Sequence, residues 1–191
     1  MNVNGIAVNI MWKEIGAILI IVYMGRIFIN MYIKNGYNRI NKKFYTNNWN
    51  GLEEEIERYK KICKVFSNGP WNKNMRLIYN GLCVASASIS LIRHNEVGFV
   101  ECLNEVKKEV DFEMKPFLLA LYYRYKQQDD VAKKYYNKYL ICNHVDEDIK
   151  VIMEYLFCQG QQRDVSEIGC TIKKFQNPAI LKLLVDNNFQ N

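Results

Sequence analysis

The feature that most constrains this chain is an apolar segment close to its N-terminus, residues 15–33, which reads IGAILIIVYMGRIFINMYI. As a helix this segment is about 28 Å long, close to the hydrocarbon thickness of a bilayer. Trp12 precedes it, and Tyr32 and Tyr37 lie at and beyond its end, where aromatic rings settle at membrane interfaces. The pattern therefore predicts a single transmembrane helix.

Two polar residues, Arg26 and Asn30, lie one turn apart within this segment. An arginine at the centre of a span costs about 2.5 to 3.5 kcal/mol, and the Leu, Ile, Val and Phe side chains return about 3 to 6 kcal/mol, so insertion stays favourable. Arg26 can extend towards the headgroups, or its face can meet a partner helix. An amphipathic helix lying in the interface remains an alternative. A cleaved signal peptide is disfavoured because only Lys13 and the amino terminus precede the segment as basic groups, no small-residue cleavage site follows it, and the residues that follow are basic.

The formal net charge of +6 is concentrated at the front of the chain. Residues 1–43 hold six basic side chains and one acidic side chain, whereas residues 44–191 hold twenty basic and nineteen acidic side chains. Binding to a phosphate backbone needs a local excess of positive charge. We therefore expect no nucleic-acid partner for the larger part of the chain.

Basic residues follow the apolar segment more densely than they precede it. Lys13 alone precedes it, beside Glu14. Those that follow are Lys34, Arg39, Lys42 and Lys43. The positive-inside rule then predicts a single-pass protein of the cell membrane whose C-terminal domain is cytoplasmic, and the four following side chains are expected to contact anionic headgroups. Six cysteines without a C-x-x-C pair agree with a reducing compartment.

Beyond residue 37 apolar residues recur at three- and four-residue steps, which predicts an all-α chain. Turn residues such as Asn68-Gly69-Pro70 and Asn177-Pro178 separate the helices. The expected helices span 37–47, 50–66, 72–92, 95–110, 113–126, 129–142, 146–159, 164–175 and 178–188. The expected domains are a short N-terminal segment 1–14, a transmembrane helix 15–33, a basic juxtamembrane segment 34–44 and a helical-repeat domain 45–191.

A period of 34 residues appears in the helical part, and in the first three of the four pairs that follow a large residue matches a large one or a small residue a small one. Leu119, Tyr123, Ala132 and Tyr136 recur as Met153, Phe157, Ser166 and Cys170. In this pattern the chain resembles the tetratricopeptide repeat (TPR) family, with the best unit at Met114–Leu140. The resemblance implies a right-handed stack of antiparallel helical hairpins. Glu154 stands where the family has a small residue, and a generic stack of α-hairpins is the alternative.

The resemblance also implies a concave groove lined by the first helices of successive hairpins. The groove positions are Asn80, Cys83, Ala87 and Ser90, then Met114, Phe117, Leu121 and Arg124, then Asp148, Val151 and Tyr155. An apolar centre with Arg124 at its edge suits an amphipathic helix or an extended peptide that carries an acidic group. Helix 178–188 is expected to fold back and cap the last hairpin.

Motifs for catalysis, nucleotide binding and metal binding are missing from the sequence. The two histidines, His94 and His144, are interpreted as polar turn residues. Acidic clusters such as Asp146-Glu147-Asp148 fall in first helical turns, where they complement the helix dipole. We expect neither catalytic residues nor a metal or cofactor, and no enzymatic activity.

These features favour a membrane-anchored cytoplasmic scaffold or adaptor that binds a protein or peptide partner through a TPR-like groove. A peptide-sensing regulator that uses the same groove is the first alternative. A soluble or peripheral α-helical protein that binds nucleic acid is the second. A salt-dependent affinity for nucleic acid would distinguish this last class from the others.

Overall fold

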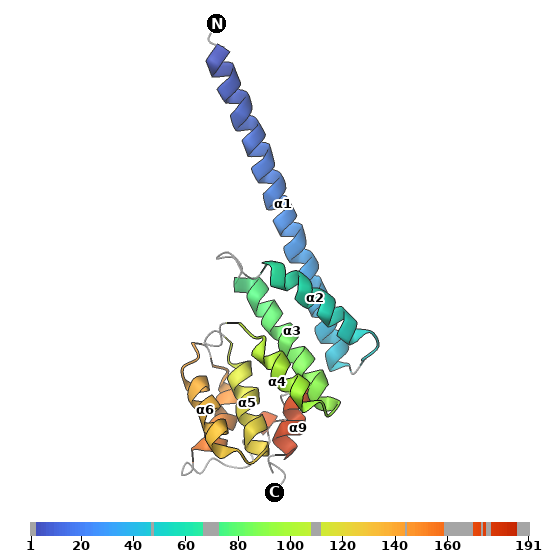
Figure 1. Cartoon of the computed structure of the whole chain (residues 1–191), viewed down its shortest axis with the longest axis vertical. Coiled ribbons are helices and arrows are strands. Elements are labelled where there is room, and N and C mark those ends of the chain that lie inside the picture. The colour runs from blue at the N-terminus through green and yellow to red at the C-terminus, as the bar shows by residue number, and fades with distance from the viewer. Residues whose placement is uncertain are drawn as a thin grey trace.

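The computed structural model describes residues 3–46, 48–66, 73–107, 112–143, 145–158, 170–172, 174 and 177–186. Within these ranges the protein is helical and contains no strand, which confirms the predicted all-α class. A long helix, α1, projects from a body formed by the remaining helices (Figure 1). His144 and most of the predicted helix 164–175 lie outside the described residues.

The helix α1 is continuous over Val3–Tyr45, a length of about 65 Å. The expectation of a separate helix at 37–47 is therefore wrong, because Asn35 and Gly36 do not interrupt α1. A glycine inside a helix costs about 1 kcal/mol relative to alanine. Here the Gly36 site lies under the ring of Tyr59, and this close helix packing outweighs the low helix propensity of glycine.

The body contains α2 (Leu52–Phe66), α3 (Lys73–Ile92), α4 (Glu96–Asn104), α5 (Met114–Tyr125), α6 (Asp129–Leu140), α7 (Glu147–Phe157) and α9 (Pro178–Asp186). Neighbours in sequence pack side by side, most extensively α5 with α6, α3 with α4 and α2 with α3. Most bounds agree with the predicted ones to within two residues. The exception is α4, which ends six residues early because the chain at Lys107 is held by Asn80 instead of continuing as a helix.

Local signals explain where several helices begin and end. Asn95 caps α4 by accepting a hydrogen bond from the Gly98 amide at 2.9 Å. Asp146 caps α7 through the amides of Asp148 and Ile149. His94 has a φ of 60°, in the left-handed region that turns use, so its predicted turn role is confirmed.

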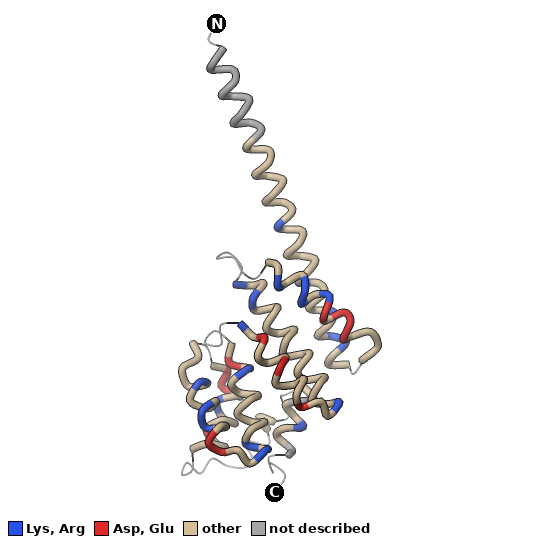
Figure 2. Tube along the Cα trace, in the orientation of Figure 1, with Lys and Arg blue, Asp and Glu red and all other residues tan. Residues whose placement is uncertain are grey.

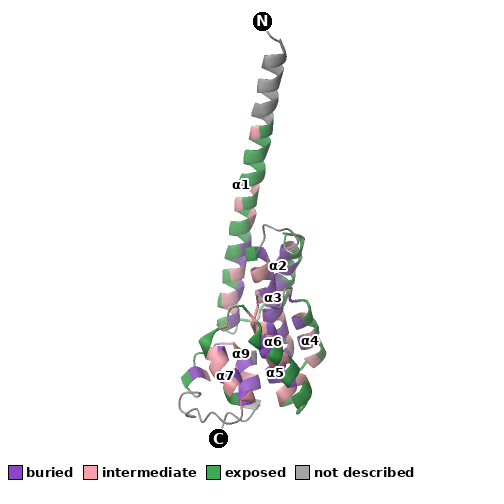
Figure 3. Ribbon diagram, turned by 90° about the vertical axis from the view of Figure 1, so that its left-hand side faces the viewer, coloured by how far each residue is buried: buried purple, intermediate pink, exposed green. Residues whose placement is uncertain are grey.

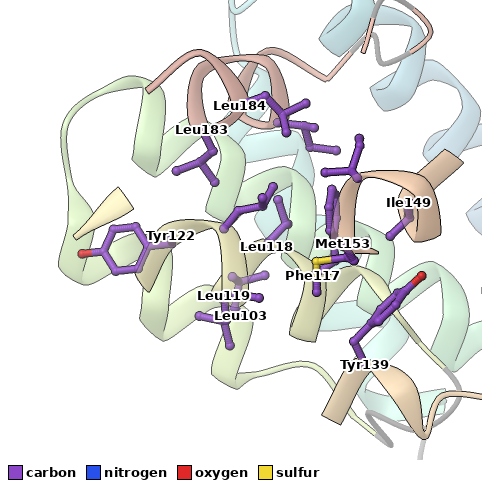
Figure 4. Packing of buried hydrophobic residues seen from close by; sticks show 14 of the residues in the cluster. Leu103, Phe117, Leu118, Leu119, Tyr122, Tyr139, Ile149, Met153, Leu183 and Leu184 are labelled. Atoms are coloured by element: carbon purple, nitrogen blue, oxygen red, sulfur yellow. The ribbon is translucent and has the colours of Figure 1, made fainter. Parts of the chain in front are cut away.

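Two hydrophobic clusters form the core, and α3 takes part in both. One joins the end of α1 to α2 and α3, with Ile33, Ile40 and Phe44 from α1. The other joins α3, α4, α5, α7 and α9, and includes Phe117 and Leu118 (Figure 4). Because α3 lies between the clusters, its apolar sequence is explained by burial within the body.

Within the described residues the last helix, α9, packs mainly against α3 and α5. Ile180, Leu183 and Leu184 are buried in the same cluster as Phe117 of α5 and Ile149 of α7, and Asn177 donates a hydrogen bond to Ser88 Oγ at 3.2 Å. The expected cap on the last hairpin stays a prediction, because most of the second helix of that hairpin, 164–175, lies outside the described residues.

Candidate functional site

The projecting part of α1 exposes apolar side chains on all faces. Each residue from Ile18 to Tyr23 is largely exposed, with an exposed fraction between 59% and 70%. Figure 3 shows the same contrast, exposed along the projecting part and buried where α1 meets the body. In a soluble protein a helix that is apolar on all faces is normally buried. This part of α1 is apolar on all faces, but the rest of the protein does not bury it.

Among the described residues two helices are long and apolar enough to cross a membrane. One is α3, most of which is packed inside the body. The other is α1, whose apolar window has no buried share and lies near the N-terminus. Of these two helices, α1 is therefore the one whose apolar surface is exposed.

The body packs against α1 from Ile33 onward, and two of the contacts are close approaches of an aromatic ring to a glycine. A Cβ atom at Gly36 would overlap the Tyr59 ring of α2, and a Cβ atom at Gly81 of α3 would overlap the Tyr37 hydroxyl of α1. Glycine at both sites lets an aromatic ring lie against the helix backbone. These contacts fix the rotation of α1 about its own axis relative to α2 and α3.

An ion-pair cluster strengthens this grip and uses two of the four expected headgroup contacts. Glu55 of α2 is buried and accepts hydrogen bonds from Arg39 and, at 2.8 Å, from Lys43, both on α1. Burial raises the pKa of Glu55, but the hydrogen bonds from Lys43 and Arg39 outweigh burial, and the pKa is lowered overall. Arg39 and Lys43 therefore serve to join α1 to α2, whereas Lys34 and Lys42 remain exposed.

Five of the eleven expected groove residues are buried, so this part of the predicted groove is not open. Ala87, Phe117 and Leu121 lie in the hydrophobic cluster that includes α9, and Cys83 lies in the cluster that joins α1, α2 and α3. Asn80 is also buried, and its amide holds the backbone of Lys107 through two hydrogen bonds, of 2.8 and 3.0 Å. The 34-residue period does not indicate which other helices of the chain cover these residues.

The other expected groove residues are partly or fully exposed and do not form one surface. Ser90, Met114 and Val151 are half-buried, and Tyr155 is exposed. Arg124 lies 5.4 Å from the Phe157 ring centroid. Asp148 accepts a hydrogen bond from Lys174 at 2.7 Å, so both charged groups are already engaged by neighbours.

A cleft of about 460 Å³ opens between the two core clusters. It contains one of the expected groove residues, Met114, and brings together the end of α1, α3, the start of α5, α7 and α9. Its lining residues are Tyr37, Asn41, Phe44, Tyr45, Gly81, Val84, Ala85, Phe112, Glu113, Met114, Asp146, Ile149, Lys174, Asn177 and Ile180. A cleft of this size accommodates a few side chains of a peptide or a small molecule.

The cleft has an apolar wall and a polar rim. Phe44, Val84 and Ala85 form part of the wall. At the rim the Glu113 carboxylate accepts a hydrogen bond from the Asp146 amide at 2.7 Å, and Lys174 is paired with Asp148. The rim thus carries the carboxylates of Glu113 and Asp146 beside the Lys174 cation.

Sequence reasoning missed this cleft because its residues come from five separate parts of the chain. Tyr37 and Asn41 are one turn apart on α1, and Glu113 and Asp146 stand near the starts of α5 and α7. Within each element the residue types are ordinary for a helix surface. Only the packing of α1 and α9 against α3 brings them to one site.

The described part of the chain brings no three His, Cys, Asp or Glu side chains together as metal ligands would require. Burial raises the pKa of Cys63 to about 11 and of Cys83 to about 12, so both thiols are held in the unreactive neutral form. These two residues behave as the small hydrophobic residues that the sequence predicted.

No protein-family model, no curated protein and no solved structure matches this chain. The function is therefore argued from the geometry of α1, of the body and of the cleft.

Proposed function

We propose that the protein is a single-pass membrane adaptor, in which α1 crosses the bilayer and holds the helical body at the cytoplasmic surface. One observation carries the proposal: the apolar exposed helix and the helix that packs into the body are the same rigid element, α1. A span on a flexible linker would leave the body free to rotate and tilt. A continuous helix instead fixes both the height and the orientation of the body.

The cytoplasmic orientation rests on the basic residues that follow the span. Arg39 and Lys43 are paired with Glu55 in the folded body, but the positive-inside rule acts during insertion, before this pairing forms. The expected orientation is therefore unchanged. The TPR-like stack also stays part of the proposal, since the packing of α3 with α4 and of α5 with α6 supports a series of hairpins.

The partner site of the adaptor is proposed to be the cleft beside α1 rather than the groove, because five of the eleven groove residues are buried. An extended peptide with an apolar anchor residue suits the wall of Phe44, Val84 and Ala85. A basic residue next to the anchor suits the rim carboxylates of Glu113 and Asp146. The cleft is therefore expected to bind a basic group, whereas the groove predicted from the sequence was expected to bind an acidic group.

A peptide-sensing regulator is the second candidate, and the volume of the cleft favours it. About 460 Å³ holds a short peptide segment or a small ligand, whereas a long amphipathic helix needs an extended groove. Because Tyr37 and Asn41 of α1 line the cleft, an occupant would contact the anchoring helix directly. Binding of a short free peptide, without any larger partner, distinguishes the sensor from the adaptor.

The anchoring half of the proposal is tested by carbonate extraction and by a C-terminal topology reporter on the full chain. We expect the chain to stay in the membrane pellet and the reporter to be cytoplasmic. Release of the chain by carbonate, or a reporter on the other side of the membrane, would contradict the proposal.

The binding half is tested by selecting short peptides from a displayed library against the full chain in nanodiscs. Replacement of Asn41 by Trp fills the cleft from α1, and this variant is expected to lose the selected peptides. Replacement of exposed Asn137 on α6 by Trp is the matched control and should retain them. Peptides that bind the Asn41→Trp variant and the original protein equally well would place the site elsewhere.

A further inference from the structure

The body carries a strongly basic surface at the end nearest the projecting part of α1. Residues 58–76 contain no acidic residue and have six basic ones. These belong to the second half of α2 and the beginning of α3, which lie together at this end of the body (Figure 1). Figure 2 shows basic positions gathered there and acidic positions farther away along α2. The charge is therefore not spread evenly but faces the proposed membrane.

Contacts between α1 and α2 fix the height of this surface along α1. Glu55 pairs with Lys43, and Tyr59 lies against Gly36, so the two helices run antiparallel. Phe66 is seven residues beyond Tyr59, which corresponds to about 10 Å towards the N-terminal end of α1. The end of α2 is thus level with about Ile29, inside the apolar segment.

Two apolar side chains are exposed where α2 ends. Val65 has an exposed fraction of 74% and Phe66 of 37%. Exposed Lys61 and Lys64 flank them on the same helix, and exposed Lys73 begins α3. An apolar pair ringed by lysines is the pattern of helices that lie at a membrane interface, where the apolar groups enter the acyl boundary and the ammonium groups reach the headgroups.

We propose that this end of the body is a second membrane contact that binds anionic lipid headgroups. Val65 and Phe66 enter the interface, and the exposed basic groups of Lys34, Arg58, Lys61, Lys64 and Lys73 face the phosphates. Lys60 does not belong to this surface, because it is buried and pairs with Glu57 and Glu105 at 3.0 and 3.1 Å. The inference rests on the proposed crossing of the bilayer by α1.

The height of α2 along α1 also decides which residues meet the headgroups. Arg39, Lys42 and Lys43 lie about 9 to 15 Å along α1 beyond Ile33, on the side away from the span. Of the four expected contacts Lys34 lies nearest to the level of the α2 end, about 8 Å along α1 from Ile29. A lipid surface fits the new set better than an acidic protein does, because exposed apolar side chains stand beside the bases at the level of the span.

The test uses the full chain in nanodiscs of phosphatidylcholine with and without phosphatidylglycerol, and measures amide hydrogen exchange. Exchange at the end of α2 and the start of α3 should be slower by about tenfold with the anionic lipid, and high salt should remove much of the difference. The triple variant Lys61→Glu, Lys64→Glu, Lys73→Glu should lose the protection. A control with the same change of charge, Lys42→Glu, Lys133→Glu, Lys134→Glu, should retain it.

The outcomes separate the two proposals. If the chain is in the nanodisc but exchange is the same in both lipids and in both variants, the second contact is wrong and the anchor stands. If the chain does not co-purify with nanodiscs of either composition, the anchor and the second contact fail together. A chain in which the control variant loses protection equally would also overturn the assignment of this surface.

Discussion

Gly36 of α1 lies so close to the ring of Tyr59 on α2 that a single methyl group on the glycine Cα would overlap the ring. Tyr59 is itself buried, and its ring also packs on that of Tyr32, with centroids 5.4 Å apart. The ring therefore has little room to move aside. This contact determines how α1 meets the body.

Replacement of Gly36 by Ala should lower the free energy of unfolding by about 1 to 2 kcal/mol, since an overpacking cost of about 1 to 3 kcal/mol exceeds the gain in helix propensity. Denaturant unfolding of the full chain in detergent measures it. Gly25→Ala on the same helix meets nothing within 4 Å and serves as the control. A smaller residue at position 59, as in Tyr59→Leu, should restore part of the loss; equal effects at positions 25 and 36 would contradict the packing.

Replacement of Glu55 by Gln should remove a pH-dependent part of the stability. The pKa of Glu55 is lowered in the folded protein, so its contribution is present above the ordinary carboxylate pKa of about 4.3 and is lost as the pH falls through the folded value. We expect about 1 to 2 kcal/mol near neutral pH from the hydrogen bonds to charged donors. The difference between the original protein and the variant, measured by unfolding at several pH values, should shrink in acid. Glu54→Gln, at an exposed neighbour, should show no such trend.

Removal of residues 1–30 should leave a folded body, whereas removal of residues 1–44 should not. The longer deletion removes Ile33, Ile40 and Phe44 from the core, and each buried side chain of this kind contributes about 1.5 to 3 kcal/mol. Their sum is a large share of the 5 to 15 kcal/mol that is roughly typical of a domain. Circular dichroism and thermal unfolding of the two shortened chains measure the difference. Equal melting temperatures would show that the end of α1 is not part of the body.

Replacement of Leu183 by Ala should destabilise the body by about 2 to 5 kcal/mol, because this side chain is fully buried between α9 and its neighbours. The half-buried Leu181 on the same helix is the control and should cost clearly less on replacement by Ala. Hydrogen exchange should also increase in α3 around Ser88 and Leu91, which α9 covers. Faster exchange confined to α7 would instead support a cap on the last hairpin.

The cysteines should react with iodoacetamide in a fixed order. Cys170 is exposed and should be alkylated first, while Cys63 and Cys83 are buried with raised pKa values and should react only after unfolding. Mass spectrometry of peptides after timed labelling gives the order. Rapid labelling of Cys83 in the folded protein would contradict its place in the core.

Much of this protein was readable from the sequence because the signals are local. The apolar length of residues 15–33, the three- and four-residue spacing beyond residue 37 and the turn residues predicted helices whose bounds largely agree with the structure. A capping residue such as Asp146 acts on amides two and three positions away, so it is visible without tertiary information.

Tertiary structure alone decided how those helices combine. Arg39 and Lys43 pair with Glu55 of α2 instead of contacting headgroups as expected. Gly36 lies within one continuous helix and contacts Tyr59 of α2. Both arrangements exist because α2 lies beside α1. In the same way Phe117 is buried together with α9, and Cys83 is buried together with α1 and α2, so the open site is the cleft beside α1 and not this part of the expected groove. The sequence determined which helix faces are apolar and must be buried. Many apolar faces share the same local pattern, so this pattern does not decide which faces pack against each other. Long-range packing decides that pairing.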